Sequence, residues 1–423
     1  MNKFRLSVLT ALLLSASAMA HAEEVVTWWD FFGGGDGVRM RQIIDNFNKE
    51  NEGKIRIQPT TLDFGSPFYT KVQTSTAVGE GPDIMSYDAS HIPLGVSQGG
   101  LQQIADSDLA VLGLKVEDFD ASMWNSVLAD GKPYAIPMDT HGILLFYNKD
   151  RLKAAGLLDD KGLPKDIDTL EKFNLALKKL KDGGTPTPLA ATSADDFHVY
   201  TATSLLCQLG GEMMTGKEWL AGDNGAKLAQ ALDVISGWVK EGYAPAYTEH
   251  VASTGLFTSG QAAFHINGNW EVPTFSDLAS KGELGFEWGA IELPPLMGKK
   301  CTYVDTSALA IPVNQNKELT PEKRAAVLKV MRYVLDNGLV WATAGHIPAL
   351  KSITQSEAFK KMEPNATYSS LTQNTIYDPR SPFAGVGTPL WELVGNAVKA
   401  TVNGEESGES AVEVLKEDLQ ALQ

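Results

Sequence analysis

The sequence predicts an α/β fold, and three observations lead to this prediction. Short apolar segments with the period of β-strands alternate with longer segments whose apolar residues recur every three or four positions. The first unit joins a strand at 24–30 to a helix with Met40, Ile43, Ile44 and Phe47 on one face. The chain has 423 residues, a length that usually divides into two or more cores.

The first 22 residues have the pattern of a secretory signal peptide. Lys3 and Arg5 precede the apolar run 6–14, and small residues follow up to an expected cleavage after Ala20 or Ala22. The run is too short to cross a bilayer, and no later stretch approaches ~18 uninterrupted apolar residues. We therefore expect an exported, soluble protein without a lipid or membrane anchor.

Charge restricts the partners of such a protein. The formal net charge is −16, and loss of Lys3 and Arg5 with the signal peptide makes it more negative. A surface of this sign disfavours nucleic acid and anionic lipid as partners.

The alternation of strands and helices continues along the chain. Further strands are expected at 55–61, 84–86, 134–137, 143–147 and 262–266, several of them beside glycine and proline turns. Helical spacing recurs in four apolar sets: Leu170, Phe173, Leu177, Leu180; Leu228, Leu232, Ile235, Val239; Val327, Val330, Met331, Val334; and Val412, Leu415, Leu419, Leu422.

The two cysteines give little geometric information. Cys207 and Cys301 are far apart in sequence, and an oxidising compartment permits a disulfide between them without requiring one. Because Cys207 lies in the apolar run Leu205-Leu206-Cys207, we expect it to be a buried small hydrophobic residue.

The end of the first strand is the first candidate binding site. Trp28, Trp29 and Asp30 lie at its carboxyl end, where open α/β sheets meet their ligands. An indole face beside a carboxylate suits a sugar, whose C–H groups pack on the ring while its hydroxyls donate to the acid. Alternation along a strand leaves open that one of the two tryptophans is ordinary core.

Six motifs in order then resemble one family. They are Trp28-Trp29-Asp30, Gly81-Pro82-Asp83-Ile84, Tyr147-Asn148-Lys149-Asp150, Gly260-Gln261-Ala262-Ala263-Phe264, Asn267-Gly268-Asn269-Trp270 and Ala344-Gly345-His346-Ile347-Pro348. Together they resemble extracellular solute-binding protein family 1, the sugar-binding proteins of ABC importers that include the maltose-binding protein.

The resemblance implies a periplasmic-binding-protein fold, in which two α/β lobes surround a ligand cleft and the chain crosses between the lobes several times. Crossings are expected near 138–141, near 302–306 and near Pro348. The N-terminal lobe would comprise 23–138 and 306–348, and the C-terminal lobe 139–305 and 349–423. The implied function is to capture a mono- or oligosaccharide in the periplasm by hinge closure, as a monomer, and to deliver it to permease subunits in the inner membrane.

The resemblance also implies further ligand-binding residues. The N-terminal lobe would contribute Asp63 and Phe64 after the second strand and Asp88, Ser90 and His91 after the third. Ser90 and His91 stand where the maltose-binding protein has an acid and a base, which places a malto-oligosaccharide in doubt. The first crossing would add Asp139 and His141, and the second would add Asp305.

The C-terminal lobe has its strongest signal around Trp270. We expect Asn267 in a turn, Asn269 as the cap of a helix that Trp270 opens, and Trp270 on the cleft wall opposite Trp28 or Trp29. Trp391, at the start of a later amphipathic helix, is a further candidate, with core packing as its alternative. Simple structural roles also stay open for Asp63, as a turn residue, and for Asp139, as an acceptor of backbone amides.

Other functions find less support. The sequence has no His-x-x-x-His or Cys-x-x-Cys pair and no Gly-x-Ser-x-Gly motif, so neither a metal, a cofactor nor an enzymatic activity is predicted. A glycoside hydrolase with two carboxyl groups stays a minor alternative. A cleft rich in Trp and Asp also suits a polyamine, which makes a polyamine receptor of the same fold the second hypothesis.

Overall fold

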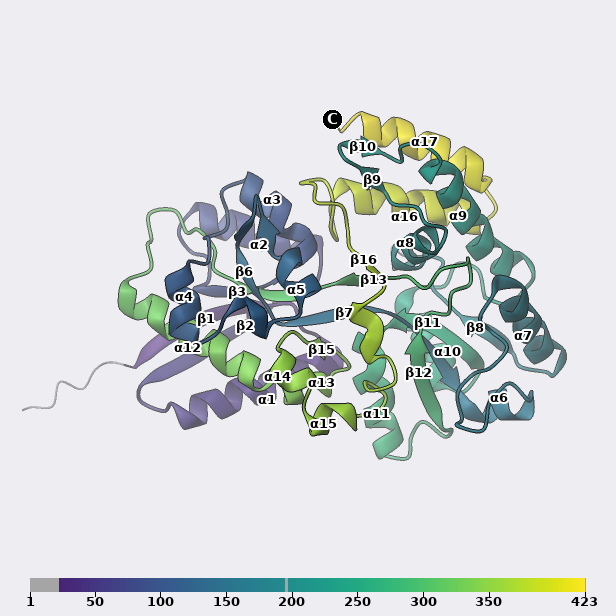
Figure 1. Ribbon diagram of the computed structural model, residues 1–423, viewed down its shortest axis with the longest axis horizontal. Coiled ribbons are helices and arrows are strands. Elements are labelled where there is room, and N and C mark those ends of the chain that lie inside the picture. Colours follow the sequence, from purple (N-terminus) through teal and green to yellow (C-terminus); the bar gives the residue numbers. More distant parts are fainter. Residues whose placement is uncertain (1–22, 195–196, 423) are drawn as a thin grey trace, which may run out of the picture.

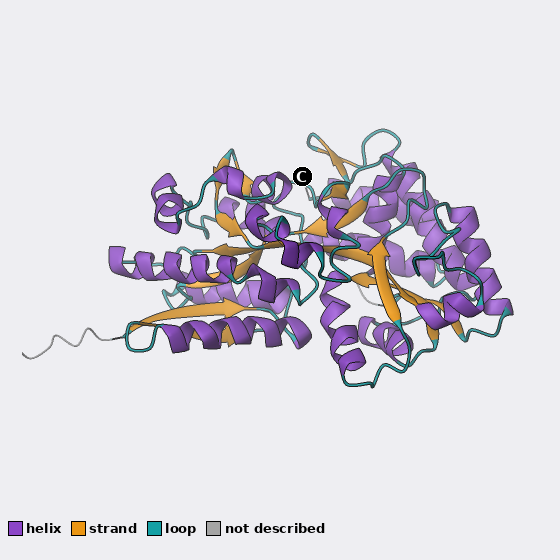
Figure 2. Cartoon of the chain, turned by 60° about the horizontal axis from the view of Figure 1, so that its bottom comes forward, coloured by secondary structure: helices purple, strands orange, loops and turns teal. Residues whose placement is uncertain are grey.

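The computed structural model describes residues 23–194 and 197–422, so the predicted signal peptide lies outside the described residues. Figure 1 shows two lobes side by side, with the purple, blue and green segments mostly in one and the teal and yellow segments mostly in the other. Each lobe is a sheet covered by helices, as Figure 2 shows. The predicted α/β class and two-lobe architecture are confirmed.

The first lobe is built on a sheet with the strand order β2-β1-β3-β14-β6. Strands β1 and β2 pair in parallel, as do β1 and β3, whereas β14 is antiparallel to β3 and β6. The strands are β1 (Glu24–Asp30), β2 (Ile55–Thr61), β3 (Ile84–Asp88), β6 (Ala135–Pro137) and β14 (Ser307–Ala310). Its helices are α1 (Gly34–Glu50), α2 (Ser66–Ala77), α3 (Ile92–Ser97), α4 (Asp106–Leu112), α5 (Ala121–Ser126) and α12 (Pro321–Asp336).

The second lobe is built on a sheet with the order β16-β13-β7-β11-β8, in which β12 and β15 also pair with β7. The strands are β7 (Asp139–Asn148), β8 (Thr187–Ala190), β11 (Ala262–Gly268), β12 (Trp288–Glu292), β13 (Thr302–Asp305), β15 (Ile347–Pro348) and β16 (Thr375–Ile376). Its helices are α6 (Lys149–Ala154), α7 (Leu170–Asp182), α8 (His198–Gln208), α9 (Asn224–Lys240), α10 (His250–Thr258), α11 (Val272–Ser280), α16 (Pro389–Val402) and α17 (Gly408–Gln420).

Short elements complete the chain. Two hairpin pairs are β4 (Leu128–Ala129) with β5 (Lys132–Pro133) and β9 (Met214–Thr215) with β10 (Glu218–Trp219). The short helices include α13 (Gly338–Ala342), α14 (Lys351–Thr354) and α15 (Glu357–Lys360), and the 3-10 turns are η1 (Ala89–His91), η2 (Val116–Asp118), η3 (Asn269–Glu271) and η4 (Ser369–Thr372).

The chain passes between the sheets at the predicted places. Met138 separates β6 of the first sheet from β7 of the second, and Thr306 separates β13 from β14. Near the third predicted crossing, Pro348 in β15 pairs with Asp139 at the start of β7. The segments that join the lobes therefore lie together at the hinge, where their side chains meet.

The alternation of side chains along β1 determines which of the first two tryptophans is buried. Val26, Trp28 and Asp30 are buried while Thr27 and Trp29 are partly exposed, as expected for one strand with two faces. On the following helix α1, the four predicted apolar residues Met40, Ile43, Ile44 and Phe47 are all buried. The strand and helix therefore pack as one unit, with Trp28 inside it.

A disulfide joins α8 to the segment before β13. Cys207 and Cys301 are bonded, with their Cα atoms 5.8 Å apart. The expectation for Cys207 is wrong in this respect, since it is buried but not free; sequence separation concealed that α8 packs against β13. Throughout 23–194 and 197–422, no helix combines the length and the apolar character that crossing a membrane requires.

Candidate functional site

A cavity of about 440 Å³ lies at the junction of the lobes and takes its wall from both of them. The first lobe contributes residues that follow β1, β2 and β3, at the carboxyl ends of those parallel strands. The second lobe contributes residues from β7, α8, α10 and the segment after β11. The wall comprises Phe31, Phe32, Gly33, Gly34, Gly35, Asp36, Thr61, Leu62, Asp63, Phe64, Asp88, His141, Phe197, Tyr200, His250, Trp270, Glu271, Thr274, Ser307 and His346.

Aromatic rings of the first lobe form one side of the cavity. Phe31 contacts Phe32 and Phe64 edge to face, with ring centroids 5.1 and 5.2 Å apart. Phe31 also packs on Phe68 of α2, which anchors the group to the core. Phe64 is the most exposed of these rings, at 39%, and so offers a free apolar face to the cavity.

A second aromatic group belongs to the second lobe. Trp270 lies 5.8 Å from Tyr200 and 6.2 Å from Phe197, measured between ring centroids. Phe197 in turn stacks on His250 at 4.3 Å. The cavity therefore has aromatic walls contributed by each lobe, the arrangement that grips the apolar faces of a flat or ring-shaped ligand.

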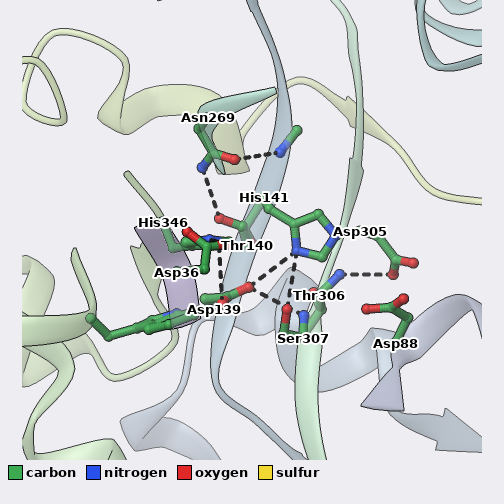
Figure 3. Close-up of polar contacts among 12 residues, drawn as sticks. Asp36, Asp88, Asp139, Thr140, His141, Asn269, Asp305, Thr306, Ser307 and His346 are labelled. Atoms are coloured by element: carbon green, nitrogen blue, oxygen red, sulfur yellow. Dashed lines mark hydrogen bonds and ion pairs between the residues drawn. The ribbon is translucent and has the colours of Figure 1, made fainter. Parts of the chain in front are cut away.

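Polar groups at the hinge form a network that crosses between the lobes (Figure 3). The carboxylate of Asp139, at the start of β7, accepts hydrogen bonds from Trp341 Nε1 at 2.6 Å and from the Ser307 amide at 3.2 Å. His141 Nδ1 lies 3.3 Å from Asp139 Oδ1. His346 lies between two acids, with Nε2 3.0 Å from Asp36 and Nδ1 3.2 Å from Asp139.

The network is charged in spite of its burial. Burial alone lowers the pKa of His346, but Asp139 and Asp36 outweigh it and raise that pKa to about 10. Burial likewise raises the pKa of Asp139, but His346 and His141 outweigh it and hold that pKa well below its usual range. At neutral pH an imidazolium therefore lies between Asp36 and the carboxylate of Asp139, while burial raises the pKa of Asp36. The imidazolium ring stacks on Trp341 at 4.6 Å.

Two further acids meet beside this network. Asp88, at the end of β3, accepts a hydrogen bond from Tyr69 Oη at 3.0 Å, and Asp305 accepts from the amides of Ser90 and Thr306 at 3.2 and 2.7 Å. Burial and the negative charge of Asp305 raise the pKa of Asp88 to about 7, and burial also raises the pKa of Asp305.

Five of the residues predicted from sequence line the cavity. They are Asp63, Phe64, Asp88, His141 and Trp270. Asp63 and Phe64 follow β2, Asp88 ends β3, and the last two residues come from the second lobe. The structure thus brings together predicted residues from both halves of the chain.

The residues on which the prediction of the first-lobe wall rested lie elsewhere. Trp28 is fully buried, and its Nε1 donates to Ser86 Oγ at 3.1 Å within the core. Trp29 is outside the cavity on the other face of β1, with Lys71 Nζ 5.9 Å from its ring. Asp30 accepts from the Phe32 amide and from Thr61 Oγ1, so it shapes the turn that presents Phe31 and Phe32. These placements correct the expectation that Trp28 or Trp29 faces Trp270.

Four other candidates are buried outside the cavity wall. His91 is buried, stacks on Tyr69 at 3.5 Å and contacts the Val386 carbonyl, while the Ser90 amide holds Asp305. Asp139 is fully buried, and Asp305 is 3% exposed. None of these four is part of the cavity wall described above, and of them Asp139 contacts the wall residues His141, Ser307 and His346.

Three further second-lobe candidates, Asn267, Asn269 and Trp391, also lie outside the cavity wall. Asn267 hydrogen-bonds His250, a wall residue, through its amide at 3.0 Å. Asn269 is not the expected helix cap, because its side chain instead accepts from the Gly142 amide and donates to the Gly345 carbonyl, which joins β7 to the hinge. The ring centroids of Trp391 and Tyr200 are 4.6 Å apart, and Trp391 is buried. Trp391 is therefore a core residue, which was the alternative to a ligand-binding role.

Sequence reasoning missed most of the wall. Phe31 and Phe32 adjoin the predicted Trp28-Trp29-Asp30 motif, and a shift of two residues along the chain would have found them. No sequence pattern pairs Asp36 with His346, so their contact could not be predicted from the sequence. Phe197, Tyr200, His250 and Glu271 reach the cavity only through the packing of α8, α10 and η3, which no local motif records.

Comparison with known proteins gives consistent results. The family model described as bacterial extracellular solute-binding protein matches residues 42–367. The galactooligosaccharide-binding protein of Bacillus subtilis (strain 168) is 24% identical over 422 residues, which cover 95% of this chain and 90% of that protein. The diacetylchitobiose-binding protein DasA of Streptomyces coelicolor is 22% identical, with coverage of 95% and 90%.

Solved structures share the fold. The GacH receptor of Streptomyces glaucescens, studied without ligand and with acarbose, superimposes with a TM-score of 0.79 at 18% identity and covers 95% of this chain and 98% of its own. The maltose-bound MalE3 of T. maritima gives the same TM-score and identity, with coverage of 94% and 100%.

Proposed function

Because the chain belongs to the bacterial extracellular solute-binding protein family, we propose that it is the substrate-binding component of a carbohydrate ABC importer. Its ligand is a mono- or oligosaccharide, which it binds in the cavity between the lobes. The relatives support a carbohydrate, since those reported above are named for galactooligosaccharide and diacetylchitobiose. Export to the periplasm, cleavage near Ala20 or Ala22, a monomeric state and delivery to inner-membrane permease subunits complete the proposal.

One observation carries the choice of a sugar. The cavity has aromatic groups from both lobes, with Phe64 from the first and Trp270 from the second, and its wall also includes carboxylate and imidazole groups. Pyranose rings present apolar C–H faces to aromatic rings and hydroxyls to polar groups at their edges. A volume of about 440 Å³ also lies in the range of small-molecule sites.

The polar groups divide into two roles in this proposal. Asp63 is exposed, His141 is partly exposed and Asp88 is buried at the wall, so these three are placed to hydrogen-bond sugar hydroxyls directly. Asp139 and Asp305 lie beside His141 and Asp88, Asn267 holds the wall residue His250, and Asn269 holds the backbone at Gly142. The lobes close around the ligand because a saccharide that contacts both walls favours the conformation in which both walls are near.

A calorimetric panel tests the proposal. The chain from residue 23 is titrated with galactooligosaccharides, diacetylchitobiose, maltodextrins and simple hexoses, and separately with putrescine and spermidine. We expect saturable binding of at least one saccharide. Binding of a polyamine in the absence of any saccharide binding would replace this proposal with the polyamine receptor.

The enzyme alternative needs a different readout. The protein is incubated for long periods with the saccharide that binds, and the products are separated by chromatography. We expect the saccharide to be recovered intact. Sustained release of shorter sugars would show that the acids of the cavity act as a glycoside hydrolase.

A further inference from the structure

Three side chains beside the cavity form a compact cluster of possible metal ligands. Asp88, His141 and Asp305 each offer one ligand atom, and these atoms all lie within 4.8 Å of one another. We call these residues the Asp–His–Asp cluster. Its members come from β3, β7 and β13, which are far apart in sequence, so no spacing motif could reveal it.

Strand register brings the cluster together. Asp305 of β13 is paired with His141 of β7 across the second sheet. The chain then crosses at Thr306, and Ser307 at the start of β14 is paired with Asp88 of β3 in the first sheet. Directly paired residues have their Cβ atoms about 4.5–5.5 Å apart, so the crossing places all three side chains at one point of the hinge.

One carboxylate oxygen in this cluster has no partner. Asp88 is 1% exposed, and its Oδ2 accepts from Tyr69, but Oδ1 has no hydrogen bond to any atom of the described residues. Asp305 brings a second buried carboxylate to the same place. Buried carboxylates of this kind are normally paired with a cation or coordinate a metal.

His141 is oriented as a metal ligand usually is. Its Nδ1 is 3.3 Å from both Asp139 Oδ1 and Ser307 Oγ. The other ring nitrogen points toward Asp305 and Asp88 (Figure 3). Metal-bound imidazoles almost always donate their second N–H to a carboxylate or another acceptor, which fixes the tautomer and turns the free lone pair to the metal.

From these observations we propose that the Asp–His–Asp cluster binds a divalent metal ion, for which Zn²⁺ is the best match. Asp88, His141 and Asp305 are the protein ligands, and Asp139 is a positioning residue that orients His141. Zn²⁺ accepts imidazole nitrogen and carboxylate oxygen, and three protein ligands leave a fourth position. Because Asp88 and His141 line the cavity, that position is within reach of a bound molecule. The proposal does not depend on the nature of the saccharide.

Calorimetry with Zn²⁺ tests the site. The untagged chain from residue 23 is treated with EDTA, freed of the chelator and titrated with Zn²⁺ alone. We expect one saturable site in the wild type and a loss of affinity of at least about tenfold in both Asp88→Asn and Asp305→Asn. Absence of a saturable site in the wild type would overturn the proposal.

A matched control distinguishes metal ligation from the general effect of removing a negative charge. Asp378 is partly exposed and lies near the cluster, where its surroundings and Asp305 raise its pKa to about 7. Its carboxylate accepts from Tyr303 Oη at 2.9 Å and is not part of the cluster. Asp378→Asn removes a similar charge and no ligand, so we expect its Zn²⁺ affinity to change far less. An equal loss in Asp378→Asn and Asp88→Asn would contradict direct ligation.

A measurement on the wild type covers the case in which variants fold poorly. Co²⁺ in place of Zn²⁺ has visible absorption bands whose intensity reports low-coordinate binding, and one equivalent should suffice to reach saturation. Bands with the weak intensity of hydrated Co²⁺ would contradict the site. Saccharide binding is measured in EDTA in parallel, so that failure of the metal site and failure of the proposed function are distinguished.

Discussion

At the scale of single residues, burial determines which aromatic side chain can meet a ligand. Trp270 is partly exposed in the cavity wall, whereas Trp28 is fully buried in the first-lobe core and Trp29 packs outside the cavity. An indole stabilises a sugar complex only through the surface that the ligand covers. Trp270 therefore has the direct role, and the two N-terminal tryptophans have a structural one.

Replacement of Trp270 by alanine gives the corresponding prediction. The variant Trp270→Ala loses the aromatic face of the second lobe, and we expect the saccharide to bind about 2–4 kcal/mol more weakly by calorimetry. Trp29→Ala is the matched control, since it removes the same side chain from a partly exposed position outside the cavity. Equal losses in the two variants would show that the effect comes from general destabilisation.

The roles of individual residues in the candidate site were harder to predict from the sequence than the fold. The sequence located the segments correctly, since Phe64, Asp88, His141 and Trp270 line the cavity together. It could not decide between Trp28 and the following Phe31, because that choice depends on which face of β1 packs on α1 and on the turn held by Asp30. Nor could it detect the pairing of Asp36 with His346, which depends on the docking of α1 at the hinge.

At the scale of elements, α1 of the first lobe contacts α11 of the second. Arg39 donates to both carboxylate oxygens of Asp277, at 2.7 and 2.6 Å. The approach is close, since a Cβ at Gly35 would lie 2.5 Å from the side chain of Pro273. These contacts join the two lobes, and they stabilise the conformation in which the lobes are near.

Loss of this ion pair should weaken saccharide binding indirectly. If opening separates α1 from α11, Asp277→Ala removes an interaction present only in the closed form. Asp277 is partly exposed, so the effect is small, about 0.5–1 kcal/mol or a two- to fivefold weaker affinity by calorimetry.

A control for this variant is available within one helix. Arg332 and Asp336 form an ion pair at 2.8 Å inside α12, and that pair does not join the lobes. Asp336→Ala should leave the affinity for saccharide unchanged. A similar loss in both variants would argue that surface charge alone is responsible.

Another contact between elements makes stability depend on pH. Asp108 of α4 is 3% exposed and accepts two hydrogen bonds from Arg324 of α12, at 2.8 and 2.6 Å. Burial raises the pKa of Asp108, but the hydrogen bonds from Arg324 outweigh it and lower that pKa below its ordinary value. A lowered pKa means that this pair stabilises the fold above the unfolded value of about 3.9 and that the contribution is lost as the pH falls through the folded value.

Urea denaturation at two pH values measures this contribution. We expect Asp108→Asn to unfold about 1–3 kcal/mol more easily than the wild type at pH 7, because a charge-assisted pair is lost. At about pH 3 the gap between the two proteins should become smaller. A gap that stays constant between these pH values would assign the effect to packing and not to the charge of Asp108.

At the scale of the whole molecule, the sequence predicted more than it did for single residues. The alternation of strands and helices and the ordered motifs indicated two α/β lobes, and the sheets meet at Met138 and Thr306 within the expected crossings. Such features are spread over hundreds of residues, so local errors do not remove them. The cavity depends on how the lobes pack on each other, which is a property of the assembled fold.

The structure of a saccharide complex tests the central claim most directly. Crystals are grown with the saccharide that calorimetry identifies, and the electron density of the sugar is located. We predict the sugar in the cavity between the lobes, with a ring packed on Trp270 and its hydroxyls within hydrogen-bond distance of Asp63, Asp88 or His141. Sugar density elsewhere on the protein, with the wall around Trp270 in contact only with solvent, would contradict the account.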